Sequence, residues 1–236
     1  MTIPVGIGYF EEPASGGLTI STDTAEPKSL PRINEPAPDF VAQSTQGEIK
    51  LSGYRGRKWV VLFSHPADFT PVCTTEFVAF SKLWAEFDKR NVQLIGLSVD
   101  SIYSHIGWLT SIERNFGVKV PFPLIPDRSM KIAQDYGMIH PGASDTATVR
   151  AVFVIDDKGI IRALVYYPLQ VGRNMDEILR IVDALQTVDK NGVATPANWE
   201  PGDAVIVPAP VTTEGAENRK GEGYEYVDWY FSKKKL

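Results

Sequence analysis

The chain has few of the residues that form disulfides or bind transition metals: one cysteine, Cys73, and three histidines in 236 residues. A single cysteine excludes a disulfide within the chain. His65, His105 and His140 are far apart in sequence and no cysteine pair accompanies them, so we expect neither a metal site nor another cofactor. His65, directly before a proline, is the histidine best placed for a functional role, whereas we expect His105 and His140 to be partly exposed residues of a helix and a loop.

Long apolar runs and an excess of basic residues are also missing. No stretch approaches the roughly 20 consecutive apolar residues that span a bilayer, and the N-terminus lacks the basic region and apolar core of a secretory signal. The net charge of −5 disfavours a nucleic-acid partner, since surfaces that bind phosphates are normally basic. We therefore predict a cytoplasmic protein with no membrane and no nucleic-acid partner, in keeping with its single cysteine.

The composition changes along the chain in two places. With 43% hydrophobic residues the chain has ample material for a packed core, but the first 29 residues are largely polar and contain glycine and proline. From Thr195 onward, prolines flank the short apolar segment Val205–Val207. We predict an N-terminal extension at 1–29, a main domain at 30–190 and a smaller C-terminal domain at 191–236 that buries little by itself.

The one cysteine stands at a junction between a strand and a helix. Cys73 ends the run Pro66–Cys73, which follows the apolar, strand-like stretch Trp59–Phe63 and precedes an amphipathic helical pattern. Such junctions are where α/β folds build sites, and the free N–H groups and positive dipole end of a helix stabilise a thiolate. Thr70 offers a hydroxyl three residues earlier, and two prolines restrict the loop. The pattern favours an activated thiol.

A second interpretation of Cys73 is a packed core residue. Cys73, Phe77, Phe80, Trp84 and Phe87 follow spacings of four and three, so the cysteine lies on the apolar stripe of its own helix. A lone cysteine on a helix is more often a small buried hydrophobe than a nucleophile. The prolines and the hydroxyl favour the reactive thiol, because a core cysteine requires neither. Both interpretations can hold if the side chain packs while the sulfur reacts.

Periodicity predicts an alternation of strands and helices after this first helix. Expected strands are 92–100, 150–155 and 160–166, an extended segment is expected at 122–127, and expected helices are 102–115 and about 130–136. Asp156–Gly159 is a strong hairpin signal, and Asn174 is suited to cap a further helix with Glu177 at its third position. This order of elements suits a thioredoxin-like α/β sandwich.

The run Leu62–Glu76 resembles the peroxiredoxins, whose signature is a proline, three residues, a threonine or serine, two residues and the peroxidatic cysteine. It is most similar to the one-cysteine subgroup related to peroxiredoxin six, in the alkyl hydroperoxide reductase and thiol-specific antioxidant family. The similarity extends from Leu30–Phe40 to the C-terminal end. The resemblance implies a thioredoxin-like fold with a smaller C-terminal dimerisation domain that packs on a partner subunit.

The resemblance also implies a role for seven residues of this chain. The catalytic ones are Cys73 as the peroxidatic cysteine, Thr70 as the hydroxyl that orients peroxide, Pro66 as the shield of the pocket and Arg150 as the arginine beside the sulfur. The supporting ones are His65, Glu76 and Arg173. For an arbitrary arginine at the start of a strand, a surface charge would be the more usual interpretation. Only the motif match assigns Arg150 to the site.

The implied function is a thiol-dependent peroxidase that reduces hydrogen peroxide and organic hydroperoxides. The Cys73 thiolate attacks the terminal peroxide oxygen, displaces water or an alcohol and becomes a sulfenic acid. Because the chain has no second cysteine, an external thiol or other reductant must resolve this sulfenic acid. The resemblance further implies a homodimer, with a ring of dimers as the larger option.

The sequence bears on two activities other than a peroxidase. An oligomeric holdase chaperone or a peroxide sensor, switched by Cys73 oxidation, is the alternative that the sequence leaves open, and repeated turnover with an added reductant separates it from a peroxidase. Phospholipase A2 activity, found in the animal branch of the subgroup, requires a serine in a Gly-x-Ser-x-Gly-like element. The matching stretch Gly56–Val60 has Lys58 at the position of that serine, so this activity is not expected.

Overall fold

The central sheet of the main domain has five strands, which pair in parallel in one half of the sheet and antiparallel in the other. The structure, a computed structural model, describes residues 30–236, so the expected extension at 1–29 lies outside the described residues. The strands are β3 (Trp59–Ser64), β4 (Val92–Ser98), β5 (Leu124–Pro126), β6 (Arg150–Ile155) and β7 (Ile161–Tyr167), in the order β5-β4-β3-β6-β7. β3, β4 and β5 pair in parallel, whereas β6 pairs antiparallel with both β3 and β7.

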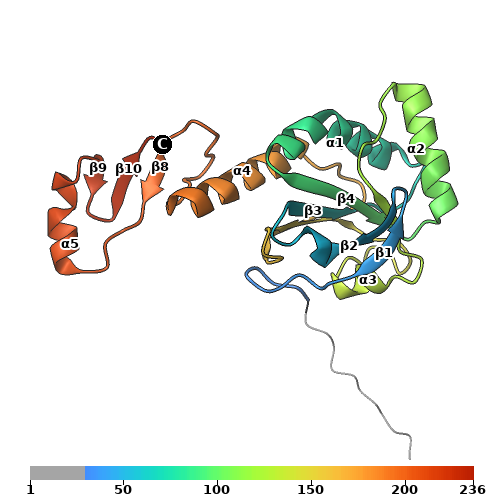
Figure 1. Cartoon of the computed structure of the whole chain (residues 1–236), viewed down its shortest axis with the longest axis horizontal. Coiled ribbons are helices and arrows are strands. Elements are labelled where there is room, and N and C mark those ends of the chain that lie inside the picture. The colour runs from blue at the N-terminus through green and yellow to red at the C-terminus, as the bar shows by residue number, and fades with distance from the viewer. Residues whose placement is uncertain (1–29) are drawn as a thin grey trace, which may run out of the picture.

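Helices cover both faces of this sheet (Figure 1). One face carries α1 (Pro71–Lys89), α2 (Ile102–Phe116) and α4 (Met175–Asn191), and their apolar residues share one buried cluster with β3, β4 and β6. The other face packs on the short α3 (Lys131–Asp135), the 3-10 turn η1 (Leu51–Tyr54) and the hairpin of β1 (Val41–Ser44) and β2 (Gly47–Lys50). Burial on both faces explains why β3 and β6 are continuous apolar runs instead of alternating ones. The α/β thioredoxin-like sandwich is confirmed.

Local sequence signals set several of the boundaries. Asn174 caps α4, as predicted, because its side-chain oxygen accepts a hydrogen bond from the Glu177 N–H at 3.1 Å. Gly159 has a φ of 81° in the β6–β7 turn, a backbone conformation that glycine adopts without strain. The first helix starts two residues before Cys73, at Pro71, because proline is well suited to the first helical position.

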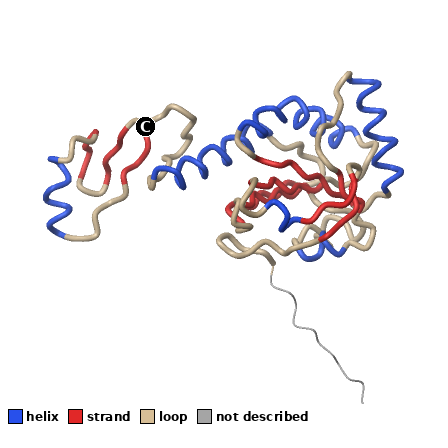
Figure 2. The backbone as a smooth tube through the Cα atoms, viewed as in Figure 1, coloured by secondary structure: helices blue, strands red, loops and turns tan. Residues whose placement is uncertain are grey.

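The C-terminal part forms a second, smaller sheet, which Figure 2 shows set apart from the sandwich beyond α4. Its strands are β8 (Val205–Val207), β9 (Glu225–Asp228) and β10 (Phe231–Lys234), in the order β8-β10-β9, next to α5 (Thr213–Asn218) and the 3-10 turn η2 (Arg219–Gly221). Its buried cluster is small, and four large apolar side chains of the β9–β10 hairpin are exposed: Tyr226, Val227, Trp229 and Tyr230. The domain boundaries themselves stay predictions.

The expectation for His105 was wrong. Its side chain is fully buried, because α2 presents it toward the loop after β3 and toward β5, where both ring nitrogens find polar partners. His140 is exposed in the loop that follows α3. Within residues 30–236, no helix is both long enough and apolar enough to cross a bilayer.

Candidate active site around Cys73

Cys73 lies in the first turn of α1, and both interpretations of it apply. The residue is fully buried and belongs to the apolar cluster that contains Phe77 and Phe80. Its sulfur nevertheless has a charged partner, since Arg150 Nη1 lies 3.3 Å from Cys73 Sγ. The first N–H groups of a helix have no carbonyl partner within it, so a thiolate at this position also lies at the positive end of the α1 dipole.

Arg150 is held in place by two partners besides the sulfur. It begins β6, as predicted, and its Nε and Nη2 donate to the Leu169 carbonyl at 2.9 and 2.7 Å. Nη1 donates to Glu76 Oε2 at 2.7 Å as well as to the sulfur. Because the guanidinium is a rigid planar fork, these contacts fix the direction in which Nη1 points.

Glu76 connects this arginine to a second one, Arg173. The Glu76 carboxylate accepts hydrogen bonds from the Arg173 backbone N–H, Nε and Nη2, all within 2.9 Å. Arg173 Nη1 donates to the carbonyls of Ser64 and Ala151. The cluster thus joins α1, both central strands β3 and β6, and the segment before α4, and it brings together four of the predicted residues: Cys73, Glu76, Arg150 and Arg173.

The buried side chains around the sulfur carry a net positive charge, from two arginines and one glutamate. Burial alone would raise the pKa of Glu76, but the charge and hydrogen bonds of Arg173, with a contribution from Arg150, outweigh burial and hold that pKa below its ordinary value. An ionised Glu76 between two arginines leaves one positive charge uncompensated. A thiolate at Cys73 supplies the missing negative charge, and a paired buried charge costs far less than an unpaired one.

Replacing Glu76 with glutamine should destabilise the protein by about 3 kcal/mol, because it leaves two buried arginines with no carboxylate. The loss, measured by urea unfolding, should be largest above pH 4.5, the ordinary pKa of the group. It should shrink as the pH falls through the lowered folded-state pKa, where wild-type Glu76 also becomes neutral. Glu86→Gln on the exposed side of α1 is the matched control and should change little. Equal effects of the two changes would contradict this account.

Thr70 and Pro66 lie in the loop between β3 and α1. Thr70 is the residue before the first helical position, and its Oγ1 donates to the Ala67 carbonyl at 2.8 Å. Since a hydroxyl has one hydrogen and this one is donated to Ala67, the Thr70 oxygen can accept a hydrogen bond from a bound hydroperoxide but does not donate to the sulfur. Pro66 is partly buried in the same loop. Thr70 and Pro71 also line an open apolar hollow of about 400 Å³ with Trp108 and Phe116 of α2.

His65 is buried next to this loop and forms hydrogen bonds away from the sulfur. Its Nε2 lies 2.9 Å from Asp68 Oδ1, and its carbonyl accepts from Thr148 Oγ1 at 2.7 Å. Burial lowers the pKa of His65. Asp68 and His105 are polar residues of this region that the sequence reasoning missed. Asp68 follows His65 by three residues, a usable signal, but His105 is 37 residues from Asp68 and gave none.

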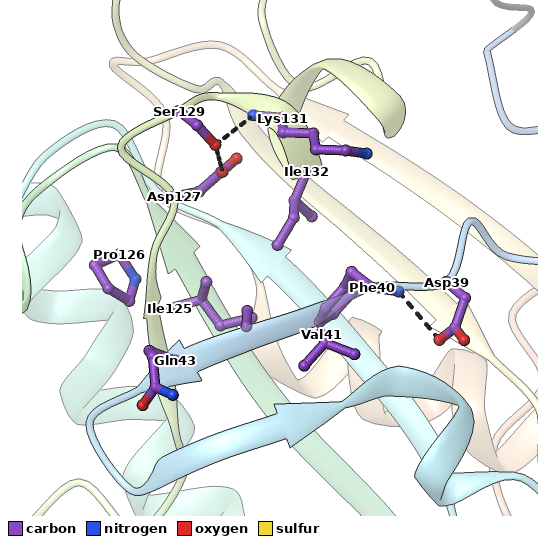
Figure 3. A pocket seen from close by; sticks show the side chains of 11 residues that line it. Asp39, Phe40, Val41, Gln43, Ile125, Pro126, Asp127, Ser129, Lys131 and Ile132 are labelled. Atoms are coloured by element: carbon purple, nitrogen blue, oxygen red, sulfur yellow. Dashed lines mark hydrogen bonds between the residues drawn. The ribbon is translucent and has the colours of Figure 1, made fainter.

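A second hollow, of about 410 Å³, lies on another side of the molecule, between β1 and the β5–α3 segment (Figure 3). None of the seven predicted site residues lines it. Its Asp127 carboxylate already accepts hydrogen bonds from Ser129 Oγ and the Ala133 N–H. This carboxylate therefore orders the start of α3, and the hollow gives no sign of a second catalytic site.

Known proteins resemble this chain over most of its length. The AhpC/TSA family model matches residues 33–164, and the model of the C-terminal domain of 1-Cys peroxiredoxin matches residues 184–223. A peroxiredoxin of Aquifex aeolicus is 60% identical over 218 residues, which cover 88% of this chain and 98% of the relative. Peroxiredoxin 2 of Caldanaerobacter subterraneus is also 60% identical, with 88% of this chain and 94% of the relative covered.

Solved structures of one-cysteine relatives have the same fold. The yeast mitochondrial 1-Cys peroxiredoxin matches with a TM-score of 0.76 at 46% identity, over 87% of this chain and 99% of that one. Peroxiredoxin 6 of Arenicola marina matches with a TM-score of 0.77 at 36% identity, over 87% and 98% of the two chains. The predicted peroxidase function is confirmed at the level of the family, and the holdase or sensor alternative is not favoured. The chain belongs to the AhpC/TSA family and, within it, to the one-cysteine peroxiredoxins, which are thiol-dependent peroxidases.

Proposed function

We propose that Cys73 is the peroxidatic nucleophile for hydrogen peroxide and organic hydroperoxides, and that Arg150, Thr70 and Pro66 complete its catalytic site. The observation that carries the proposal is the 3.3 Å contact between Arg150 Nη1 and Cys73 Sγ at the start of a helix. A thiolate there is held by a permanent cation and by backbone N–H groups. The supporting residues are Glu76, which binds Arg150, Arg173, which binds Glu76, and His65, which binds Asp68 in the loop before Cys73.

The reaction follows from the charges around the sulfur. The thiolate attacks the terminal oxygen of the hydroperoxide, the O–O bond breaks, and the departing oxygen takes up a proton to leave as water or an alcohol. Negative charge grows on both peroxide oxygens in the transition state, so N–H donors that are already oriented lower the barrier. Arg150 Nη1 and the first-turn amides of α1 are such donors. Thr70 Oγ1 would accept a hydrogen bond from the O–H group of the substrate and so direct the terminal oxygen of the substrate toward Cys73.

The sulfenic acid must be returned to the thiol by an external reductant, because no second cysteine exists in the chain. The structure of the yeast mitochondrial relative describes thiol resolution through glutathione and thioredoxin systems. We assign the same chemical class, a small or protein thiol, to this chain. Such a cycle requires a compartment with abundant thiols, and we place the protein in the cytoplasm on that ground.

A homodimer is the proposed assembly, with the C-terminal domain packed on a partner subunit and a ring of dimers as a larger form. The exposed aromatic side chains of the β9–β10 hairpin, Tyr226, Trp229 and Tyr230, support it, since aromatic residues are enriched in protein interfaces. Light scattering that gave a monomer at micromolar concentration would contradict this assembly.

The test of the function is rapid mixing of the reduced protein with one equivalent of hydrogen peroxide, followed by tryptophan fluorescence. Trp108 stacks on His65 beside the loop between β3 and α1, so oxidation of Cys73 should change the fluorescence emission of Trp108. A sulfenic-acid trap analysed by mass spectrometry identifies the oxidised residue. Oxidation orders of magnitude faster than that of a free thiol, with the trap on Cys73, is the expected result. A rate equal to that of a free thiol would make Cys73 a packing residue and overturn the proposal.

A further inference from the structure

One buried polar cluster behind the loop 65–70 contains two residues, Asp68 and His105, that have no role in the reaction described above. The Asp68 carboxylate lies between two histidines: its Oδ1 is 2.9 Å from His65 Nε2 and its Oδ2 is 2.7 Å from His105 Nδ1. The side chains of both histidines are fully buried and that of Asp68 is 1% exposed. The cluster joins the site loop to α2, and through Ile125 to β5.

The partners of His105 determine its protonation state. Its Nε2 lies 3.2 Å from the Ile125 carbonyl oxygen, which can only accept a hydrogen bond. Its Nδ1 faces the Asp68 carboxylate. Burial alone would raise the pKa of Asp68, but hydrogen bonds from His105 and His65 outweigh burial and lower it to about 2. An ionised carboxylate also only accepts hydrogen bonds. Both ring nitrogens of His105 thus face hydrogen-bond acceptors, an arrangement that an imidazolium paired with Asp68 satisfies.

The contacts of His65 favour a neutral ring. Its Nε2 donates to Asp68 Oδ1, whereas its Nδ1 is buried and has no hydrogen-bond partner. A hydrogen on Nδ1 would be a buried donor without an acceptor, which costs roughly 1–3 kcal/mol. The ring is therefore neutral, with its hydrogen on Nε2 and its lone pair on Nδ1.

The cluster also holds the loop that carries the catalytic residues. The Asp68 N–H donates to Asp100 Oδ2 at 3.0 Å, so Asp68 is fixed through both its backbone and its side chain. One turn after His105 on α2, Trp108 stacks on His65 at 5.1 Å between ring centroids, and its Nε1 donates to Thr74 Oγ1 on α1. Helix α2 thus contacts both the loop before Cys73 and the helical turn that contains it.

We propose that His105 and Asp68 are positioning residues of the peroxidase site. The buried imidazolium of His105 anchors the Asp68 carboxylate to α2 and β5. The anchored carboxylate fixes the Nε2–H form of His65 and the position of the loop 65–70, and with it Pro66 and Thr70. The kinetic part of this inference rests on the proposed peroxidase function, whereas the protonation part does not.

Two substitutions of His105 separate its two hydrogen bonds. His105→Asn places an amide N–H2 near the position of Nδ1 and so preserves a donor to Asp68, while His105→Gln places it near Nε2 and preserves only the donor to Ile125. The rate of Cys73 oxidation by hydrogen peroxide is measured by stopped flow for both. We expect His105→Gln to be slower by about ten-fold, through displacement of the loop, and His105→Asn to retain most of the rate. His140→Gln, a change at an exposed histidine, is the control and should match wild type.

Magic-angle-spinning NMR of 15N-histidine-labelled wild-type protein at pH 7 tests the protonation states without any activity. Three histidines give a simple spectrum. One ring, absent from the spectrum of His105→Asn, should have hydrogen on both nitrogens, and a second should have an unprotonated Nδ1. In His105→Gln, the tautomer signature of His65 should change, an effect that general destabilisation of a folded protein would not produce.

The outcomes separate this inference from the proposed function. A neutral His105 in the wild-type spectrum overturns it, even if the variants fail to fold. Equal rate losses for His105→Asn and His105→Gln, with an unchanged His65 signature, would reduce His105 to a structural residue. Slow oxidation of the wild-type protein would instead refute the peroxidase function and leave the NMR result standing.

Discussion

Replacement of Cys73 by serine should abolish peroxide consumption and leave the fold intact. Serine is close to cysteine in size, so the packing against Phe77 and Phe80 changes little. Its hydroxyl stays protonated at neutral pH and is a poor nucleophile toward peroxide oxygen, whereas the reaction needs a thiolate. Peroxide consumption with an added thiol reductant measures the effect, and far-ultraviolet circular dichroism checks the fold.

A relocated thiol provides the matched control for this experiment. Ser81 lies two turns further along the same helix, and its hydroxyl is buried without a hydrogen-bond partner. Ser81→Cys added to Cys73→Ser therefore restores the cysteine count at a position away from the helix start and without a hydrogen-bond donor. The double variant should remain inactive if, as we propose, the reaction needs the helix start and Arg150 and not a thiol alone. Residual turnover in Cys73→Ser would mean that the peroxidase activity resides elsewhere.

The sequence was sufficient to predict the segment that carries Cys73, because the signals that define this segment are local. The proline, threonine and cysteine lie within eight residues of one another at a strand end, and steric and capping preferences act over that range. The strands could be predicted because β3 and β6 are continuous apolar runs. The predicted ends of the elements differ from the observed ends by a few residues. Helix α3, for example, spans Lys131–Asp135, whereas periodicity predicted a helix over about 130–136.

The contacts between distant residues could not be obtained in the same way. Glu76 and Arg173 are 97 residues apart, and only the motif match placed them near the sulfur. His105 was expected to be partly exposed, because a histidine on an amphipathic helix carries no sign of a buried carboxylate 37 residues away. Buried polar networks are specified by complementary partners, so a single residue reveals little about them.

Substitution of Arg150 should have the second largest effect, a loss of about 10²–10³-fold in the rate of Cys73 oxidation for Arg150→Ala. The change removes the N–H donor 3.3 Å from the sulfur and one of the two cations that together balance Glu76 and a thiolate. Arg150→Lys retains the charge but cannot reproduce the fork that also donates to the Leu169 carbonyl, so its rate should lie between those of Arg150→Ala and wild type.

The matched control for Arg150 is Arg162, which also lies in the antiparallel half of the sheet and pairs with two carboxylates, Asp156 and Asp189. Arg162→Ala should cost stability through its lost ion pairs and leave the oxidation rate at the wild-type value. Stopped-flow oxidation by hydrogen peroxide and urea unfolding, measured on both variants, distinguish the two roles. If Arg150→Ala lost only stability, as its control does, the arginine would be a structural ion pair. Catalysis would then rest on the helix start and on Thr70, since no other cation has been placed in contact with the sulfur among residues 30–236.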